Sequence, residues 1–518
     1  MSEIKQAIKE ELKALHKANK LDLPSIRKGI STNSGLVNFD LDKPAKLAVP
    51  VFDYLRKNLP REKGDGGIQA NWRTVVGVNT SGVTIGIQEN HRNVDSQITY
   101  ATWSSPYALF GQEQYVSYSE QEAAEDFDDI LATAETANLI NFINSEEQEL
   151  LGGLASSSMG LGTAPNVTLT LASGNTGFAS GTVVRVNTVA LSNDGLWYLN
   201  GNGLNSFAGQ VTITTMDGDS ETRNQGLSAA GTSQTITLTA SGQSVLATWP
   251  VVSGASAYAV FAGQAGSDAT TYANQISYLN SAPITAVVSG NQALGSNFAT
   301  DYSYNPLVLN GFLTIAQNGY NQFGLTQSNL TAASNLGPIF VSAATSNTGF
   351  SSNGFGGATE IDNILKLMFQ TGRRLLSPDV MLMSPKTKIA LQKVMNPSGQ
   401  YPLFKIDVAG VGENKGQTTM STNAPSYTNS IACAGTAPFI DILIHPFMPD
   451  GAILFLCTKL PYTMSNVSNP FAVRCRRDVW EKQWPERTTR YEYGIYSSET
   501  LICYYLGAIA YLNNVNVG

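Results

Sequence analysis

Residues 115–153 read YVSYSE QEAAEDFDDI LATAETANLI NFINSEEQEL LGG, and this stretch decides the fold that we expect. Ser119 and Glu122 stand three positions apart, as in a helix capping box, and apolar residues follow at helical spacing. The pattern ends at Gly152-Gly153. It predicts one helix over residues 119–150, which would be about 48 Å long.

The predicted helix carries a charge that it cannot balance by itself. Like charges four residues apart destabilise a helix by roughly a few tenths of a kcal/mol per pair. We therefore expect basic groups from the N-terminal arm, from the ribbon described next or from the arginine-rich stretch near residue 475 to lie against it; solvent and counterions are the alternative. The helix has no basic residue and ten acidic ones, which are Glu120, Glu122, Glu125, Asp126, Asp128, Asp129, Glu135, Glu146, Glu147 and Glu149.

A two-stranded ribbon is predicted before this helix. Two runs that alternate apolar and polar residues, 73–78 and 83–87, are joined by Asn79-Thr-Ser-Gly82, a sequence typical of hairpin turns. An isolated ribbon is marginally stable in water, so we expect it to lie on a surface of its own chain or of a neighbouring one.

The N-terminal arm is basic, with thirteen Lys and Arg against eight Asp and Glu in residues 1–63. Residues 1–20 have an amphipathic helical pattern that needs a partner surface; a solvated basic tail is the alternative. The apolar face of this pattern consists of Ile4, Ile8, Leu12 and Leu15.

A separate domain is predicted at residues 165–304, after a small, flexible linker at 152–163. Between Pro165 and Asn305 the chain has six acidic and two basic residues. Short alternating runs separated by Gly, Asn and Asp turns indicate an all-β sandwich. The runs are 167–171, 183–186, 211–214, 235–239 and 258–261.

Helices and strands mix again after residue 304. Thr359 and Asp362 predict the start of a helix whose apolar face includes Leu375, and Ser384-Pro385 predicts a second helix that runs to Met395. The other residues of the first apolar face are Ile361, Ile364, Leu365 and Met368, and the strands predicted near the C-terminus include 440–444, 453–457 and 501–511.

Composition excludes several classes of protein. The net charge is −8, which disfavours a protein that reads DNA sequence, because such proteins present a strongly basic face. No stretch is apolar enough for a signal peptide or a membrane span. The cysteines and histidines lack metal-ligand spacing, so we expect reduced core thiols and neither metal nor cofactor; they are Cys433, Cys457, Cys475, Cys503, His16, His91 and His445.

Motifs that could carry catalysis are also missing. Asp217-Gly-Asp-Ser-Glu221 lacks the frame of a calcium-binding loop and is expected to be a hairpin turn. Residues 410–416 fail the spacing of a phosphate-binding loop. Ser384 is explained as a helix cap, and no Ser/His/Asp set is visible, so we expect no enzymatic activity.

The order of arm, ribbon, long helix and α+β body resembles the Hong Kong ninety-seven-type fold of tailed-bacteriophage major capsid proteins. The local matches are Tyr115-Val-Ser-Tyr-Ser-Glu-Gln-Glu-Ala-Ala-Glu-Asp, Asp379-Val-Met-Leu-Met-Ser-Pro-Lys-Thr and Asn396-Pro-Ser-Gly-Gln-Tyr. Within the inserted segment, Val245-Leu-Ala-Thr-Trp249-Pro and Gly254-Ala-Ser-Ala-Tyr258-Ala-Val260 resemble immunoglobulin or fibronectin-III modules, in which a Trp is buried between two sheets.

The capsid resemblance implies a division of the chain into parts. These are an arm (1–59), an extended loop formed by the ribbon (60–104), a peripheral domain with strand, spine helix and linker (105–164), the inserted sandwich (165–304), a continuation of the peripheral domain with a helix (305–379), an axial domain (380–470) and closing peripheral strands (471–518).

The same resemblance implies function: subunits assemble into pentamers and hexamers of an icosahedral shell around double-stranded phage DNA, in the cytoplasm of the host, with portal, scaffolding and decoration or cement proteins as further partners and no membrane. A tail or surface adhesin whose immunoglobulin-like module binds carbohydrate is the alternative, and a hydrolase with an accessory sandwich is a third. Basic residues near 475, with Trp480 and Trp484 between them, could touch DNA, but pairing with the acidic helix is favoured.

We expect contacts between subunits at two sets of charged residues. The acidic set is Glu120, Glu122, Glu125, Asp126, Asp128 and Asp129, and the basic set is Arg61, Lys63, Arg73, Arg92, Arg474, Arg476 and Arg477.

Overall fold

The computed structural model describes residues 48–78, 89–92, 98–124, 129–173, 178–202, 209–264, 273–286, 298–318, 337–343, 349–353, 357–370, 375–395, 426–431, 438–462, 465–485 and 489–518. Several predicted features lie outside these ranges: the arm helix at 1–20, the hairpin turn with the run 83–87, the acidic residues Glu125, Asp126 and Asp128, the segment 396–401, the loop 410–416, and Cys433. Among the described helices, none combines the length and the apolar character needed to cross a membrane.

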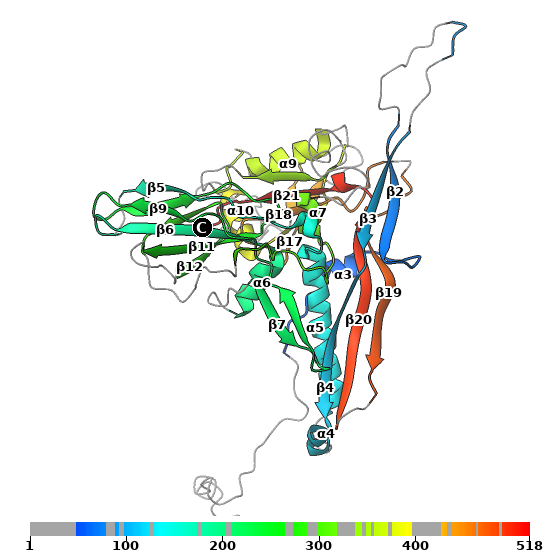
Figure 1. Cartoon of the computed structure of the whole chain (residues 1–518). Helices are drawn as coiled ribbons and strands as arrows, with labels where there is room; N and C mark the ends of the chain where they lie inside the picture. Colours follow the sequence, from blue (N-terminus) through cyan, green and yellow to red (C-terminus); the bar gives the residue numbers. More distant parts are fainter. Residues whose placement is uncertain are drawn as a thin grey trace, which may run out of the picture.

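The body contains a six-stranded mixed sheet with helices packed beside it (Figure 1), so the predicted α+β class is confirmed. Its inner strands are apolar and buried, because both faces of the sheet are covered. The order is β14 (Ile339–Ser342), β21 (Ile509–Asn513), β18 (Ile453–Leu456), β15 (Val380–Met383), β17 (Phe439–Ile444) and β16 (Ser426–Thr428).

Two helices of this body follow the sequence prediction closely. Helix α9 (Thr359–Gln370) buries Ile361, Ile364, Leu365 and Met368, as predicted. Leu375 was placed on the same face wrongly: it lies beyond the end of α9, with a φ of 54°, and is exposed. Helix α10 (Pro385–Met395) begins where predicted, since the Ser384 hydroxyl accepts the N–H of Thr387 at 3.3 Å.

A second body sheet packs against the long helix. Its four strands are β1 (Arg61–Lys63), β19 (Phe471–Gln483), β20 (Arg490–Cys503) and β4 (Ala108–Ser117), in that order. One face contacts helix α5 (Ile130–Gly152), where the rings of Phe110 and Phe142 stack with centroids 5.3 Å apart. Helices α3 (Tyr54–Asn58) and α7 (Phe312–Asn318) contact the other sides of α5.

The single helix predicted over 119–150 is wrong, because the chain forms two helices. Helix α4 spans Tyr118–Ala124, and α5 begins after Asp129, whose backbone is not helical and whose carboxylate accepts the N–H of Ala132 at 3.1 Å. Asp favours such cap positions over helix interiors. The capping box is also two residues earlier than predicted: Ser117 and Glu120 exchange hydrogen bonds between side chain and backbone at 3.2 and 3.1 Å.

The ribbon exists, but its strands pair differently. Strand β2 (Gln69–Val78) pairs antiparallel with β3 (Ile98–Pro106), which the alternating pattern did not single out. Its base is fixed to the body, since Trp72 Nε1 donates to the carbonyl of Cys503 at 3.0 Å and the Thr74 hydroxyl donates to that of Tyr504 at 2.8 Å. The two strands run side by side along the side of the body away from the insert (Figure 1).

Strands between residues 168 and 284 form two facing sheets, and Trp249 is buried against Tyr258 between them, as predicted. One sheet is β13 (Ser281–Ile284), β10 (Ser244–Thr248) and β5 (Thr168–Ala172); the other is β12 (Ala273–Ser277), β11 (Ala257–Gln264), β6 (Val183–Leu191) and β9 (Gln234–Thr237).

The insert departs from an all-β module in three ways. Helix α6 (Asn193–Asn202) follows β6, and its first turn is capped by the Ser192 hydroxyl, which accepts the N–H of Gly195 at 3.2 Å. The run 211–214 belongs to a separate hairpin of β7 (Gln210–Thr214) and β8 (Ser220–Asn224). Strand β11 pairs with the later strand β12 and also with β6, which precedes it, whereas the sheet partners of the corresponding strand in an immunoglobulin sandwich follow it in the chain.

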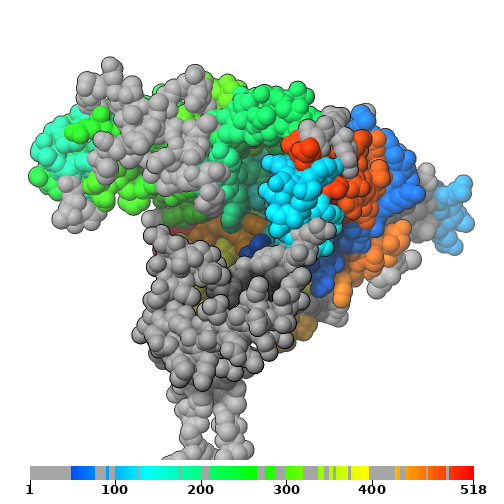
Figure 2. Space-filling model, turned by 90° about the horizontal axis from the view of Figure 1, so that it is seen from below, coloured from blue at the N-terminus to red at the C-terminus, as the bar shows by residue number. Residues whose placement is uncertain are grey.

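The insert is attached firmly to the body and lies on the side opposite the ribbon (Figure 2). Its two ends meet, because Asn305 N–H donates to the carbonyl of Leu154 at 2.8 Å. Trp197 Nε1 donates to the carbonyl of Phe447 at 3.1 Å, and the buried amide side chains of Asn280 and Asn514 are 3.0 Å apart. These contacts join the insert to the loop after β17 and to the C-terminal segment.

Candidate functional site

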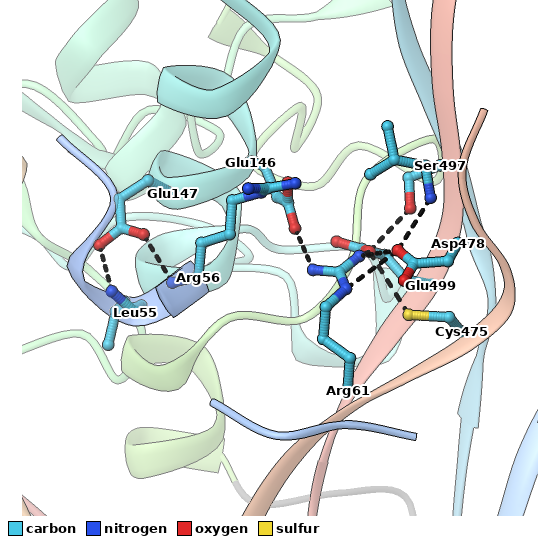
Figure 3. A network of polar contacts seen from close by, with 10 residues as sticks. Leu55, Arg56, Arg61, Glu146, Glu147, Cys475, Asp478, Ser497 and Glu499 are labelled. Carbon is cyan, nitrogen blue, oxygen red and sulfur yellow. Dashed lines mark hydrogen bonds and ion pairs between the residues drawn. The ribbon is translucent and has the colours of Figure 1, made fainter. Parts of the chain in front are cut away.

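A cluster of buried charges joins residues 50–61, which we call the arm root, to helix α5 and to the four-stranded sheet (Figure 3). Its members, called the charge cluster below, are Arg56, Arg61, Glu146, Glu147, His445, Asp478 and Glu499. Glu146, Glu147, His445 and Glu499 have no exposed side-chain surface.

Glu147 holds the arm root in place through backbone hydrogen bonds. Its two carboxylate oxygens accept the N–H groups of Leu55 and Arg56 at 2.7 and 2.9 Å, so it satisfies the first turn of α3, for which Asp53 provides no side-chain cap. Three residues before Glu147 on the same helix, the side-chain oxygen of Asn144 accepts the N–H of Phe52 at 3.0 Å. The short helix α3 is therefore capped by α5.

His445 approaches Glu147 from the end of strand β17. The distance from His445 Nε2 to Glu147 Oε1 is 3.0 Å, and His445 Nδ1 accepts the N–H of Phe447 at 3.2 Å. Because Nδ1 is an acceptor, the ring proton lies on Nε2 and points to the carboxylate. The ring of Phe52 packs edge-on against the imidazole, with centroids 4.7 Å apart.

Arg61 is the centre of the other half of the charge cluster. Its guanidinium lies 2.6 Å from Glu146 and 2.8 Å from Asp478, and it also pairs with Glu499. Arg56 binds the second oxygen of Glu146 at 2.6 Å. A single side chain of β1 thus binds α5, β19 and β20 together.

The charge cluster has more carboxylates than guanidinium groups, and this affects its protonation. Burial and the neighbouring charge of Glu146 raise the pKa of Glu499 to about 7, although Arg61 and the hydroxyl of Ser497 act in the opposite direction. Burial also raises the pKa of the adjacent Cys475 thiol to about 12, so this cysteine is a poor nucleophile.

Within the described residues, one group of three potential metal ligands occurs, and it lies in this place. Side-chain atoms of Cys475, Asp478 and Glu499 are within 4.8 Å of one another. Arg61 already binds both carboxylates, so a cation would have to displace a guanidinium. The donor set fits an ion-pair cluster better than a metal site.

The acidic residues predicted as contacts do not form the charge cluster. Among them, Glu120 and Asp129 cap helices, Glu122 is exposed, and none of these three pairs with a basic side chain of the described part. The compensated acids are instead Glu146 and Glu147. Both stand four residues before buried leucines of α5, and an acid in an apolar stripe is a signal that could have revealed a buried partner.

The basic residues predicted as contacts are dispersed. Arg61 belongs to the charge cluster, and Arg474 binds Glu62 at 3.3 Å inside the chain. Arg73 lies over the ring of Tyr100, and Arg477 lies over that of Trp480, at 5.7 and 4.4 Å from the ring centroids. The remaining three are exposed: Lys63, Arg92 and Arg476.

Comparison with known proteins gives structural similarity only. No family model and no curated protein sequence matches the chain. The structure is similar to the capsid of a native GTA particle, with 10% identity, a TM-score of 0.45 and coverage of 94% of this chain and 98% of that one. It is also similar to the capsid of Myoviridae phage XM1, with 10% identity, a TM-score of 0.39 and coverage of 94% of this chain and 99% of that one. A third similar structure is the capsid of cyanophage Pam1, with 7% identity, a TM-score of 0.40 and coverage of 94% of this chain and 98% of that one.

Proposed function

We propose that the chain is the major capsid subunit of a tailed bacteriophage. Its copies form pentamers and hexamers that close into an icosahedral shell around double-stranded DNA, without a catalytic step. The proposal includes contact with the packaged DNA that is non-specific and limited in extent. A net charge of −8 does not suit a protein whose whole surface binds phosphates.

The ribbon is the observation that carries this proposal. Its base is part of the core, with Trp72 and Trp103 buried. Further out, Val75, Ile98 and Tyr100 are 53%, 53% and 54% exposed, which is unusual for apolar side chains on a projecting element. A projecting two-stranded ribbon with exposed apolar groups needs a partner surface, and other copies of the chain supply one in a shell.

The charge cluster supports the proposal in a different way. It fixes the arm root, α5 and the four-stranded sheet in one geometry, as a subunit requires when repeated contacts must close a shell. Charged residues that are exposed and do not belong to the charge cluster remain available for contacts between subunits. We propose that Glu122, with the acidic residues near it, meets Lys63, Arg92 or Arg476 of neighbouring copies.

The division into arm, extended loop, peripheral, inserted and axial parts is proposed with the boundaries given above. The insert projects to the side of the body away from the ribbon, where it can contact a neighbouring capsomer or a decoration protein. Its low charge suits such a contact better than a free surface.

Negative-stain electron microscopy of the protein expressed alone tests the proposal. We expect rings of five or six copies, or closed shells, after purification at several salt concentrations and in the presence of a crowding polymer. Sedimentation velocity on the same samples gives the size of the assemblies. Monomers that persist under every condition would overturn the proposal.

A further inference from the structure

The insert meets the long helix at a joint with two acidic side chains. Helix α5 ends at Gly152, and α6 begins against it at Asn193. The approach is close: a side chain at Gly152 would collide with Asn193, and one at Gly153 would collide with the Glu149 carboxylate. Glu149 of α5 and Asp194 of α6 therefore lie at the contact between the two elements.

One oxygen of each carboxyl group is buried without a partner in the described residues. The residues keep some exposed surface, but Glu149 Oε2 and Asp194 Oδ1 are inaccessible to solvent and form no hydrogen bond. Asn193 is 2% exposed, and its amide oxygen and nitrogen are unpartnered too. Asp194 does not cap α6 either, because Ser192 occupies that role.

The described charged groups around the joint are engaged elsewhere. On α5, Glu146 and Glu147 bind the arm root and His445. In the segment 298–318, Asp301 accepts the N–H groups of Gly162 and Ser303. Gln225 and Gly226 lie against Gly195 of α6, and the nearby Arg223 pairs with Glu221 on the surface. No described cation neutralises the two acids at the joint.

Two neighbouring carboxylates that each have an oxygen shielded from solvent, with no cation beside them, cannot both carry a charge at low cost. A buried proton removes the charge and supplies a donor for the unpartnered oxygens. A divalent cation is the other solution, but Mg²⁺ and Ca²⁺ take about six or more oxygen ligands. The described side chains at the joint offer two carboxylates and one amide, so the geometry favours the proton.

We propose that this joint is a proton-dependent latch: protonation of the Glu149 and Asp194 carboxyl groups keeps the start of α6 seated on the end of α5, and loss of the protons loosens the insert from the long helix. The latch is a property of the single chain. It does not depend on the shell function proposed above, so either proposal can fail without the other.

The pH range follows from the direction of the pKa shifts. Burial raises the pKa of Glu149 well above its ordinary value, with the charge of Asp194 adding to the effect, and burial raises the pKa of Asp194 to about 7. Once the joint opens, both acids return to pKa values of about 4. The closed state therefore binds more protons than the open state, and closure is lost as pH rises from about 4 through about 7.

Hydrogen exchange of the full chain, measured by mass spectrometry between pH 5 and pH 7, tests the latch. After correction for intrinsic rates, we expect exchange in α6 to rise at least about tenfold per pH unit, as release of one or two protons on opening requires. The buried strand β18 serves as an internal reference. In the double variant Glu149→Gln/Asp194→Asn, which keeps the shapes of both side chains, corrected exchange in α6 should not depend on pH.

The matched control is Glu135→Gln, which changes an exposed acid of the same helix and should keep the wild-type slope. A slope in the double variant equal to that of the wild type overturns the proposal. So does protection of α6 by millimolar Ca²⁺ or Mg²⁺ at constant pH that the double variant lacks, because it would show that a cation closes the joint. The single variants Glu149→Gln and Asp194→Asn should each reduce the pH dependence of exchange in α6, so one of them still tests the proposal if the other folds poorly.

Discussion

At the scale of single residues, Arg61 connects more elements than any neighbouring member of the charge cluster. It binds carboxylates from α5, β19 and β20, and of these Glu146 and Glu499 are fully buried. Glu146 has a second partner in Arg56, whereas Glu499 pairs with Arg61 alone among the described cations. Removal of Arg61 therefore isolates one buried charge, that of Glu499.

The variant Arg61→Met should lower the free energy of unfolding by about 3–5 kcal/mol at pH 8, which is the usual cost when one partner of a buried pair is removed. The loss should be smaller at pH 5, because Glu499, whose pKa is already raised to about 7, then takes up a proton and is no longer an isolated charge. Denaturant unfolding of the unassembled chain at the two pH values measures both effects.

The double variant Arg61→Met/Glu499→Gln separates this explanation from lost packing. It should be more stable at pH 8 than Arg61→Met alone, since no uncompensated carboxylate remains at residue 499. Equal stability of the two variants would contradict the role given to Glu499. Arg73→Met is the matched control: this exposed arginine lies over the ring of Tyr100, and its substitution should lower the free energy of unfolding by less than about 1 kcal/mol.

At the scale of elements, the two candidate capping boxes at the start of α4 make different predictions. Ser117 accepts the N–H of Glu120 in the structure, whereas Ser119 is the cap predicted from the sequence. Ser117→Ala should weaken α4 by about 1 kcal/mol and speed hydrogen exchange in this helix about fivefold. Ser119→Ala, the matched control on an exposed residue, should leave exchange unchanged. Faster exchange in α4 of Ser119→Ala, with no change in Ser117→Ala, would show that Ser119 is the cap, as the sequence predicted.

How well an element can be predicted depends on how local its signals are. The start of α10 at Pro385 was predictable because its cap and first turn are contiguous in the chain. The break at Asp129 was missed because apolar residues on either side continue the same period, and the period does not report the backbone angles of one residue. Pairing of β2 with β3 was missed because register between distant strands depends on the whole body.

The candidate site shows the same division. The charge counts predicted that basic groups of the N-terminal arm lie against the acidic helix, and Arg56 and Arg61 do pair with Glu146. Arg61 was expected at a contact between subunits, and that expectation stays a prediction. They did not predict that Glu146 and Glu147 would be the acids concerned, because burial of an acid depends on what packs against it. His445 was noted only as one of three scattered histidines, and tertiary structure alone places it beside Glu147.

At the scale of the whole molecule, the rigid base and the exposed outer part of the ribbon have different roles. Trp72 and Thr74 fix the base to the last residue of β20 and to the residue after it, and Ser105 binds Thr500 at 2.7 Å. Further from the base, Val75, Ile98 and Tyr100 add exposed apolar side chains. Substitutions there should affect association between copies and leave the fold of each copy unchanged.

The triple variant Val75→Thr/Ile98→Thr/Tyr100→Ser should reduce the yield of rings or shells at least about tenfold, because loss of roughly 1.4 kcal/mol from a contact between copies changes its equilibrium constant tenfold. The thermal stability of the unassembled chain should stay within a few degrees of the wild type. Ile389→Thr/Leu367→Thr is the matched control, since these residues are 54% and 41% exposed and belong to α10 and α9, not to the ribbon. If the triple variant and the control variant give equal yields of rings or shells, the ribbon is not the contact that brings copies together. Loss of apolar surface from the ribbon would then affect assembly no more than the same loss from α9 and α10.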